Sequence, residues 1–301
     1  MSRLLWGIDL GGTKIEGVIL DEERPGSAPY RLRRETGASH GYEHVVSQIA
    51  GVVRDLEKAS GLPCPNVIGV GTPGAVEPAT GALKNSNTTC LIGRPLREDL
   101  AASFGCEVRM ANDANCFALA EASWGAAAGA GVVMGLILGT GVGGGIVVRG
   151  KVLNGLHGIA GEWGHNPMGG ESHPCYCGRK GCVETVIAGP SLERHYRESG
   201  GESIRLPEIV SRAGSGETLA RNTILRLQEK FGEAIAAVIN ILDPDAIVIG
   251  GGVGNIGALY SDETREFIRR FLFNPVLATR ILRPQLGDSA GVFGAAILGR
   301  N

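Results

Sequence analysis

The chain has 301 residues, with 29 Lys and Arg against 31 Asp and Glu, a formal net charge of −2. This length is more than one typical domain requires and fits two domains of about 100–200 residues each. The balanced charge lacks the basic surface expected of a nucleic-acid-binding protein. No run approaches the roughly 20 apolar residues of a membrane span, and Met1–Leu10 lacks the order of a signal peptide, so we expect a soluble cytoplasmic protein with a small-molecule partner.

The N-terminal segment predicts a β-hairpin. The apolar run Leu4–Leu10 meets the turn Gly11-Gly12-Thr13, and a second apolar run, Ile15–Leu20, follows it. Two such runs joined by a short glycine turn are typical of paired antiparallel strands.

A helix is predicted over Tyr42–Ser60, because apolar residues recur there at spacings of three and four and Gly61 ends the pattern. The run Asn66–Thr72 predicts a further short strand, which ends at Pro73-Gly74.

The second half of the chain repeats the opening arrangement. Val132–Leu138, Gly139-Thr140-Gly141 and Gly144–Val148 again follow the order strand, glycine turn, strand. A third strand, Ala246–Ile249, runs into Gly250-Gly251-Gly252 after a long amphipathic helix. Alternating strands and helices predict α/β domains, and the repetition predicts an internally duplicated chain.

The glycine turns are candidate phosphate sites, because no Cβ blocks the approach of an anion to the backbone N–H groups. Such turns also occur in hairpins that bind nothing, but three in one chain favour phosphate. A dinucleotide-binding motif is disfavoured: Gly139–Gly144 continues as a strand, and Gly252–Gly257 lacks a following βα unit with a ribose-binding acid. A P-loop at Gly145–Lys151 is rejected, because Val152 replaces the required Ser or Thr.

An Asn-Asp pair, Asn112-Asp113, precedes the apolar helical stretch Cys116–Ala122. Such a pair is a good helix N-cap. It also offers a carboxylate that could serve as the single base that phosphoryl transfer requires, since positioning and charge neutralisation do most of the catalytic work there. The residues alone leave both interpretations open.

A cysteine cluster predicts a metal site. Cys175, Cys177 and Cys182 have the spacing C-x-C-x₄-C, with glycines between them, and a histidine can complete a tetrahedral Cys₃His site. His165 and His173 are the two candidates for the fourth ligand. A closed set of four ligands leaves no open position, so the predicted zinc is structural.

These motifs resemble those of a known family. Asp9-Leu10-Gly11-Gly12-Thr13-Lys14, Gly139-Thr140-Gly141 and Gly250-Gly251-Gly252 are similar to the phosphate and adenosine loops of the actin-like ATPase superfamily. The whole chain resembles the ROK family of bacterial sugar kinases and repressors, whose pattern E-x-G-H followed by C-x-C-G-x-x-G-C-x-E is complete from Glu162 to Glu184.

The resemblance implies a two-domain α/β fold of the actin-like, ribonuclease H-like type with a cleft between the domains. The expected domains are a small one, residues 1–112 with a C-terminal helix over about 290–301, and a large one, residues 113–289, with the zinc-binding loop. The boundary near Asn112 rests on the duplication alone.

The resemblance also implies the site residues. ATP and Mg²⁺ are expected at the three turns, with Asp9 holding Mg²⁺ through water, and the expected contacts are Asp9, Gly11, Gly12, Thr13, Lys14, Thr140, Gly141, Gly251 and Gly252. The pattern selects His165 as the zinc ligand, with Cys175, Cys177 and Cys182. Asp113 is the expected catalytic base, and the expected sugar contacts are Gly74, Asn87, Asn112, Asp113, Glu162, His165 and Glu184.

The implied activity is ATP-dependent phosphorylation of the 6-hydroxyl of a hexose. Leu83–Thr89 and Gly93–Leu96 resemble the manno(fructo)kinase branch, which favours D-fructose or D-mannose, whereas Met134–Gly145 is equally similar to N-acetylglucosamine kinases. Glucokinase and N-acetylglucosamine or N-acetylmannosamine kinase therefore stay open.

Two other classes are disfavoured. A sugar-responsive repressor needs an N-terminal helix-turn-helix, for which the first loop at Gly11 leaves no room, and a structural ATPase does not need the cysteine cluster. Family members are often oligomers, so we expect a homodimer.

Overall fold

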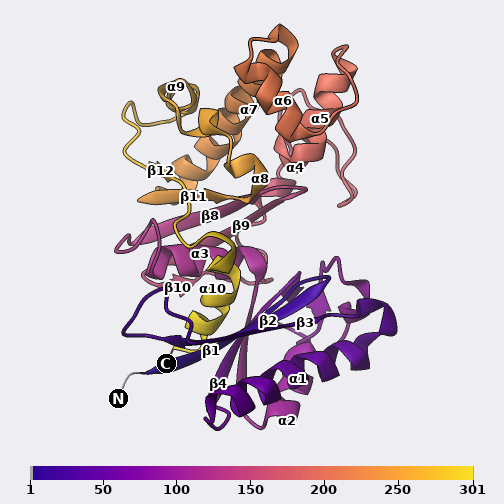
Figure 1. The fold of residues 1–301 in the computed structure, drawn as a ribbon. Coiled ribbons are helices and arrows are strands. Elements are labelled where there is room, and N and C mark those ends of the chain that lie inside the picture. The colour runs from indigo at the N-terminus through magenta and orange to yellow at the C-terminus, as the bar shows by residue number, and fades with distance from the viewer. Residues whose placement is uncertain (1–2, 301) are drawn as a thin grey trace. The chain divides into compact units, whose positions relative to one another are not determined.

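The computed structural model describes residues 3–300; Met1, Ser2 and Asn301, which the expected domain limits include, lie outside the described residues. The chain forms two compact units. The first comprises the chain up to Gly129, Gly145–Ala160 and the chain from Gln285 onward; the second comprises Ala130–Gly144 and Gly161–Pro284 (Figure 1).

The first unit is built on a five-stranded sheet with the order β3-β2-β1-β4-β7. β1 pairs antiparallel with β2, as the hairpin prediction required, and parallel with β4. The strands and helices of this unit are β1 (Leu4–Leu10), β2 (Lys14–Asp21), β3 (Tyr30–Glu35), α1 (Tyr42–Ser60), β4 (Val67–Thr72), β5 (Ala75–Val76), β6 (Leu83–Lys84), α2 (Leu96–Phe104), β7 (Glu107–Asn112), α3 (Asp113–Ser123), β10 (Lys151–Val152) and α10 (Ala290–Leu298).

Helices cover both faces of the first sheet (Figure 1). On one face α1 contributes Val45, Ile49 and Leu56 to a core with Ile8 and Ile19.

On the other face, α10 approaches so closely that only glycine fits beneath it. A Cβ on Gly7 would lie 2.4 Å from the Ala296 nitrogen, and one on Gly69 would lie 1.7 Å from the Ala295 oxygen. The glycines of β1 and β4 therefore allow the C-terminal helix to lie directly against the sheet.

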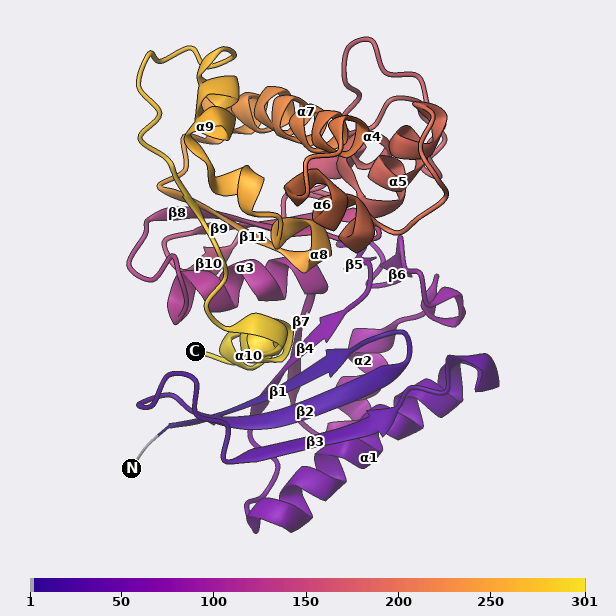
Figure 2. The same cartoon turned by 45° about the horizontal axis from the view of Figure 1, so that its top comes forward.

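The second unit contains most of a sheet with the order β10-β9-β8-β11-β12, in which β9 (Val142–Val148) begins in the second unit and ends in the first. The long helix α7 (Thr218–Leu242) packs on this sheet through Leu227, Phe231 and Ile235 (Figure 2). The other elements of the unit are β8 (Val132–Leu138), α4 (Glu184–Ile187), α5 (Gly189–Glu198), α6 (Leu206–Gly214), β11 (Ala246–Gly250), α8 (Gly251–Gly254), α9 (Asp262–Arg269) and β12 (Arg280–Leu282).

The two sheets confirm the predicted duplication. Each has an antiparallel strand pair at one side and three parallel strands, so that β3-β2-β1-β4-β7 corresponds position by position to β10-β9-β8-β11-β12. The G-x-G-x-x-G segment begins β9 and not a helix, which confirms that it is no dinucleotide motif.

The boundary expected near Asn112 does not coincide with this division. Residues 113–129 belong with the first unit because α3 packs against α10. The chain also returns to the first unit at Gly145–Ala160, where β10 contacts α3. Within residues 3–300, no helix combines the length and apolarity needed to cross a membrane.

Candidate active site and metal centre

In the first unit, the predicted Asn-Asp pair starts α3, and its two members make different contacts. Asn112 is the N-cap: its side-chain oxygen accepts a hydrogen bond from the Asn115 N–H at 2.7 Å. Asp113 is the first helical residue, has an exposed side chain and accepts a local bond from the Ala114 N–H at 2.8 Å. Capping therefore accounts for Asn112, and the Asp113 carboxylate stays available for other chemistry.

Asp113 has the electrostatics of a base. Desolvation by the surrounding atoms raises its pKa above the usual value, while the N–H groups of Ala114 and of Asp113 itself lower it. A carboxylate with a raised pKa binds a proton more strongly and is a better general base.

Asp9 is the second acidic residue of the candidate site in this unit. It lies at the end of β1, and burial, followed by the charges of Asp113 and Glu16, raises its pKa to about 6, against the opposing effect of Lys14. The carboxylate has open space beside it because its neighbours Gly71 and Gly291 lack side chains; a Cβ on Gly291 would lie 3.1 Å from its Oδ2. A hard cation bound there would relieve the repulsion between the acids.

The first glycine turn joins β1 to β2 and is exposed from Gly12 to Lys14. The Gly11 N–H donates to the Lys14 oxygen at 2.9 Å, and Thr36 holds the turn by donating its hydroxyl to the Gly11 oxygen at 2.7 Å. The backbone of the turn is therefore exposed to solvent, and these two hydrogen bonds fix its conformation.

The predicted sugar contacts Gly74 and Asn87 also belong to the first unit. Gly74 has φ +89°, and a Cβ there would lie 2.4 Å from the Lys84 oxygen, so this position requires glycine. Asn87 is exposed. Beside it lies Thr88, a residue that the sequence analysis did not select as a site residue. Its buried hydroxyl has no hydrogen-bond partner within residues 3–300 and would lie 3.8 Å from a Cβ on Gly12.

A cavity of about 200 Å³ lies against Asn112. Its lining combines the side-chain amides of Asn112, Asn115 and Asn154 with the apolar Val76 and Met110. The Asn115 side-chain oxygen is buried there and unpaired within the described part of the chain.

In the second unit, Glu184 supports the second glycine turn. Its carboxylate accepts a hydrogen bond from the Val142 N–H at 2.9 Å, and a Cβ on Gly141 would lie 2.6 Å from its Oε2. Within the turn, the Gly139 N–H donates to the Gly141 oxygen at 2.9 Å, and Thr140 is exposed. The predicted nucleotide turn and the predicted sugar acid are thus direct neighbours.

The third glycine turn begins α8 directly after β11. Gly251 has φ +83° and approaches the Leu138 oxygen so closely that a Cβ would lie 2.3 Å from it, whereas Gly252 faces open space. Both glycines are exposed, so their backbone is accessible to a ligand.

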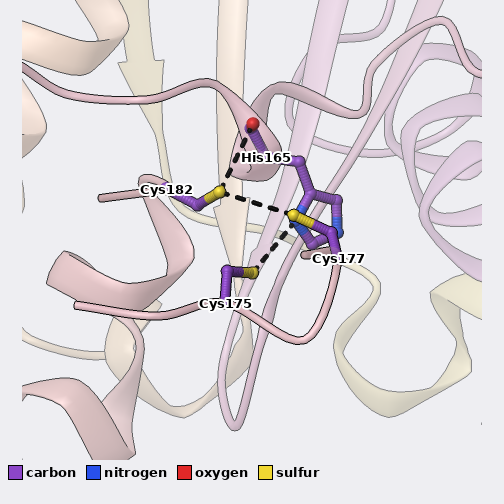
Figure 3. A group of neighbouring side chains, drawn as sticks. All are labelled: His165, Cys175, Cys177 and Cys182. Carbon is purple, nitrogen blue, oxygen red and sulfur yellow. Dashed lines mark hydrogen bonds between the residues drawn. The ribbon is translucent and has the colours of Figure 1, made fainter. Parts of the chain in front are cut away.

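The predicted metal ligands come together (Figure 3). The ligand atoms of His165, Cys175, Cys177 and Cys182 all lie within 4.8 Å of one another. Cys177 Sγ is 3.6 Å from Cys182 Sγ, and Cys175 Sγ is 3.6 Å from His165 Nδ1. A tetrahedral zinc with Zn–S bonds of about 2.3 Å has sulfur–sulfur edges of about 3.8 Å, so the four residues fit such an ion.

The other ring nitrogen of His165 meets a residue that sequence reasoning did not select. His165 Nε2 lies 3.0 Å from the Tyr176 hydroxyl, and the two rings stand edge to face with centroids 5.1 Å apart. Desolvation, then the charges of Glu184 and Glu162, raises the pKa of Tyr176 to about 12. The rival ligand His173 is not part of the cluster.

Comparisons with known proteins show the family of the chain. A model of the ROK family matches residues 5–301. The N-acetyl-D-glucosamine kinase of Photobacterium profundum is 35% identical over 305 residues, which cover 98% of this chain and 99% of that protein.

Solved structures are similar over the same length. The ROK hexokinase from Thermus thermophilus has a TM-score of 0.88 at 32% identity, covering 99% of this chain and 98% of that one. The ROK family glucokinase from Streptomyces griseus, solved with glucose and AMPPNP, has a TM-score of 0.77 at 29% identity, covering 99% of each chain.

Fold, motifs and relatives together define the class: a sugar kinase with the actin-like, ribonuclease H-like α/β fold. Within that class, the chain belongs to the ROK family.

Proposed function

We propose that this sugar kinase transfers the γ-phosphoryl group of ATP to the 6-hydroxyl of a 2-acetamido hexose, with N-acetyl-D-glucosamine as the preferred acceptor. The observation that carries the choice of sugar is the 35% identity, over 98% of the chain, to a protein named N-acetyl-D-glucosamine kinase. A preference for fructose or mannose, which Leu83–Thr89 and Gly93–Leu96 favoured in the sequence, finds no support in this relative. N-acetyl-D-glucosamine therefore replaces those two sugars as the proposed acceptor.

Asp113 is the proposed base. Its raised pKa and exposed carboxylate suit it to accept the proton of the sugar 6-hydroxyl as that oxygen attacks phosphorus. The neighbouring Asn112 fixes the start of α3 through its cap and can offer its side-chain N–H₂ to a sugar hydroxyl. Gly74 and Asn87 are the other proposed sugar contacts of this unit.

The nucleotide is assigned to the three glycine turns. In the first unit, Gly11, Gly12, Thr13 and Lys14 would contact phosphate, and Asp9 would hold Mg²⁺ through water; when bound, this ion neutralises phosphate charge. In the second unit, Thr140, Gly141, Gly251 and Gly252 would contact ATP. The support is the exposure of these turns and the lack of side chains on their glycines.

The cysteine cluster is proposed to hold a structural zinc. His165, Cys175, Cys177 and Cys182 would be its four ligands, with His165 bound through Nδ1, the nitrogen nearest Cys175 Sγ. Zinc supplies rigidity there and takes no part in the reaction. It would fix the loop from which Glu162 and Glu184 offer carboxylate acceptors to sugar hydroxyls.

Acceptor preference is tested with a panel of hexoses in an assay that couples ADP release to NADH oxidation. We expect the highest kcat/KM with N-acetyl-D-glucosamine, and lower values with N-acetyl-D-mannosamine, glucose, mannose and fructose. A lost contact to the acetamido group of a bound sugar is worth tenfold or more. A kcat/KM for fructose or mannose above that for N-acetyl-D-glucosamine would reject the proposed acceptor while leaving the class intact.

A further inference from the structure

Thr88, in the first unit, is 5% exposed, and its hydroxyl has no hydrogen-bond partner among the described residues 3–300. Its main chain is paired on both sides: the N–H donates to Ser86 Oγ at 3.1 Å, and the carbonyl oxygen accepts the Leu91 N–H at 3.0 Å. A buried hydroxyl without a partner costs folding free energy. A well-fixed backbone therefore holds a hydroxyl at a cost that a bound ligand would remove.

This hydroxyl lies beside the first glycine turn. Apart from the adjoining residues of the chain, a Cβ on Gly12 would have one neighbour within 4 Å in the described part of the chain, Thr88 Oγ1 at 3.8 Å. Gly12 has no side chain to fill the space beside the hydroxyl. Thr88 Oγ1 and the proposed phosphate turn are therefore adjacent within one unit.

Thr88 also adjoins a proposed sugar contact. Ser86 and Thr88 are buried, whereas Asn87 between them is exposed. During transfer, the γ-phosphoryl group has to lie between the nucleotide and the 6-hydroxyl of the acceptor, because it passes directly from one to the other. Thr88 is placed beside both the proposed phosphate turn and a proposed sugar contact, so it is suited to contact the group that moves between them.

We propose that Thr88 donates a hydrogen bond to a non-bridging oxygen of the γ-phosphoryl group. A threonine hydroxyl is a donor with a rotatable hydrogen, and charged phosphate oxygens accept strong hydrogen bonds. Because the hydroxyl is closed to water, the contact forms when the exposed turn from Gly12 to Lys14 adjusts around the bound nucleotide. The inference rests on the proposed function, since it takes this turn as a phosphate site.

In the transfer, the bond between the sugar 6-oxygen and phosphorus forms while the bond from phosphorus to the ADP oxygen breaks, and the sugar proton passes to Asp113. Thr88 keeps its own proton throughout. Its hydrogen bond holds one oxygen of the transferred group and stabilises the charge on that group in the transition state. Thr88 is thus a further catalytic residue with a task separate from that of the base.

The first test compares wild type with Thr88→Val, which replaces the hydroxyl by a methyl group of similar size, and with Thr88→Ser, which restores it. We expect kcat with N-acetyl-D-glucosamine to fall about 10- to 100-fold in Thr88→Val and to recover in Thr88→Ser. The Kd of the sugar should change less than about twofold. Thr89→Val, at the exposed next position, is the matched control and should keep wild-type kinetics.

The second test separates a contact with the γ-phosphoryl group from a structural role. Measured by calorimetry, the Kd of the ATP analogue AMPPNP should rise about five- to tenfold in Thr88→Val, whereas the Kd of ADP should stay unchanged. The melting temperature of Thr88→Val without ligands should equal or exceed that of wild type, because the substitution removes a buried hydroxyl that has no partner within residues 3–300.

A kcat of Thr88→Val within about twofold of wild type would overturn the proposal. So would an equal loss of affinity for ADP and AMPPNP, or a Thr88→Ser variant that is as slow as Thr88→Val. If wild type binds AMPPNP but releases no ADP with any hexose, the proposed function fails and this inference fails with it, which separates the two failures.

Discussion

Asp113 and Asn112 are neighbours in sequence with separate tasks. Asn112 closes the first turn of α3 by accepting the Asn115 N–H, and this contact would be made in any helix that begins there. Asp113 makes no such capping bond, because its carboxylate accepts a hydrogen bond from the N–H of the adjacent Ala114. An exposed carboxylate that the fold does not use for capping is the stronger candidate for chemistry.

Asp9 yields a prediction on pH dependence. Its pKa is raised from 3.8 to about 6, first by burial and then by Asp113 and Glu16. The folded state therefore binds the proton more tightly than the unfolded state, so the stability contributed by the protonated group is present below about pH 4 and is lost as the pH rises to about 6. The shift corresponds to about 3 kcal/mol.

The measurement compares the free energy of unfolding of wild type and Asp9→Asn, in urea without divalent cations, from pH 4 to pH 7. We expect the variant to gain stability relative to wild type by roughly 2–3 kcal/mol across this range. A difference that stays constant with pH would show that ionisation of Asp9 is not opposed in the folded state.

At the scale of elements, the loop with the cysteine cluster is anchored independently of the metal. Glu171 accepts two hydrogen bonds from Arg226 of α7, at 2.8 and 2.9 Å, and also pairs with Lys230 at 3.3 Å. The loop is thereby held on α7 at Glu171, ahead of the first cysteine. We expect the tip with Cys177, which is exposed, to depend on the ligand cluster.

Zinc removal should therefore loosen the tip of the loop without unfolding the unit. With metal stripped by a strong chelator, we expect the KM for the sugar to rise about tenfold or more, and to recover when zinc is added back. Cys182→Ser should show the same rise at full zinc supply, whereas Cys90→Ser, outside the cluster, should behave as wild type. Unchanged kinetics in protein that contains no zinc would exclude the proposed structural role.

The sequence predicted elements well where the pattern is local. The hairpin β1–β2 and helix α1 match their expected limits because runs of apolar residues and glycine stops mark both. No strand was predicted over β3, since Arg31 and Arg33 break its apolar character; both side chains pair with Glu16 of β2, a contact that appears only once the strands are side by side.

The same distinction holds for the site. The glycine turns and the cysteine spacing are motifs that a sequence displays, and the structure brings the four predicted ligands together. Tyr176 and Thr88 carry no such motif: one is identified by its contact with His165, and the other by a buried hydroxyl without a partner in residues 3–300.

At the scale of the whole molecule, Glu121 binds the segment at Gln285 and Leu286, where the chain returns to the first unit. Its side chain, on α3, is completely buried. The carboxylate accepts hydrogen bonds from the backbone N–H groups of Ala126 at 2.8 Å, Gln285 at 3.1 Å and Leu286 at 2.9 Å. It thus holds together segments more than 160 residues apart, ahead of α10.

Replacing this carboxylate should destabilise the fold. In Glu121→Gln one oxygen becomes an N–H₂ group that faces backbone donors, so we expect a loss of about 2–4 kcal/mol in the free energy of unfolding. Glu229→Gln, at an exposed position of α7, is the matched control and should change stability by less than about 0.5 kcal/mol. An equal effect of the two substitutions in urea would show that Glu121 does not hold the returning chain.

The central claim is that this chain transfers the γ-phosphoryl group of ATP to a sugar with Asp113 as the base. The most direct test measures ADP release from wild type and from Asp113→Asn, each with and without saturating N-acetyl-D-glucosamine. We expect ADP from wild type only when the sugar is present, a rate at least about 100-fold lower for the variant, and an almost unchanged Kd for the sugar. ADP release that does not depend on the sugar, or a variant that turns over like wild type, would contradict the claim.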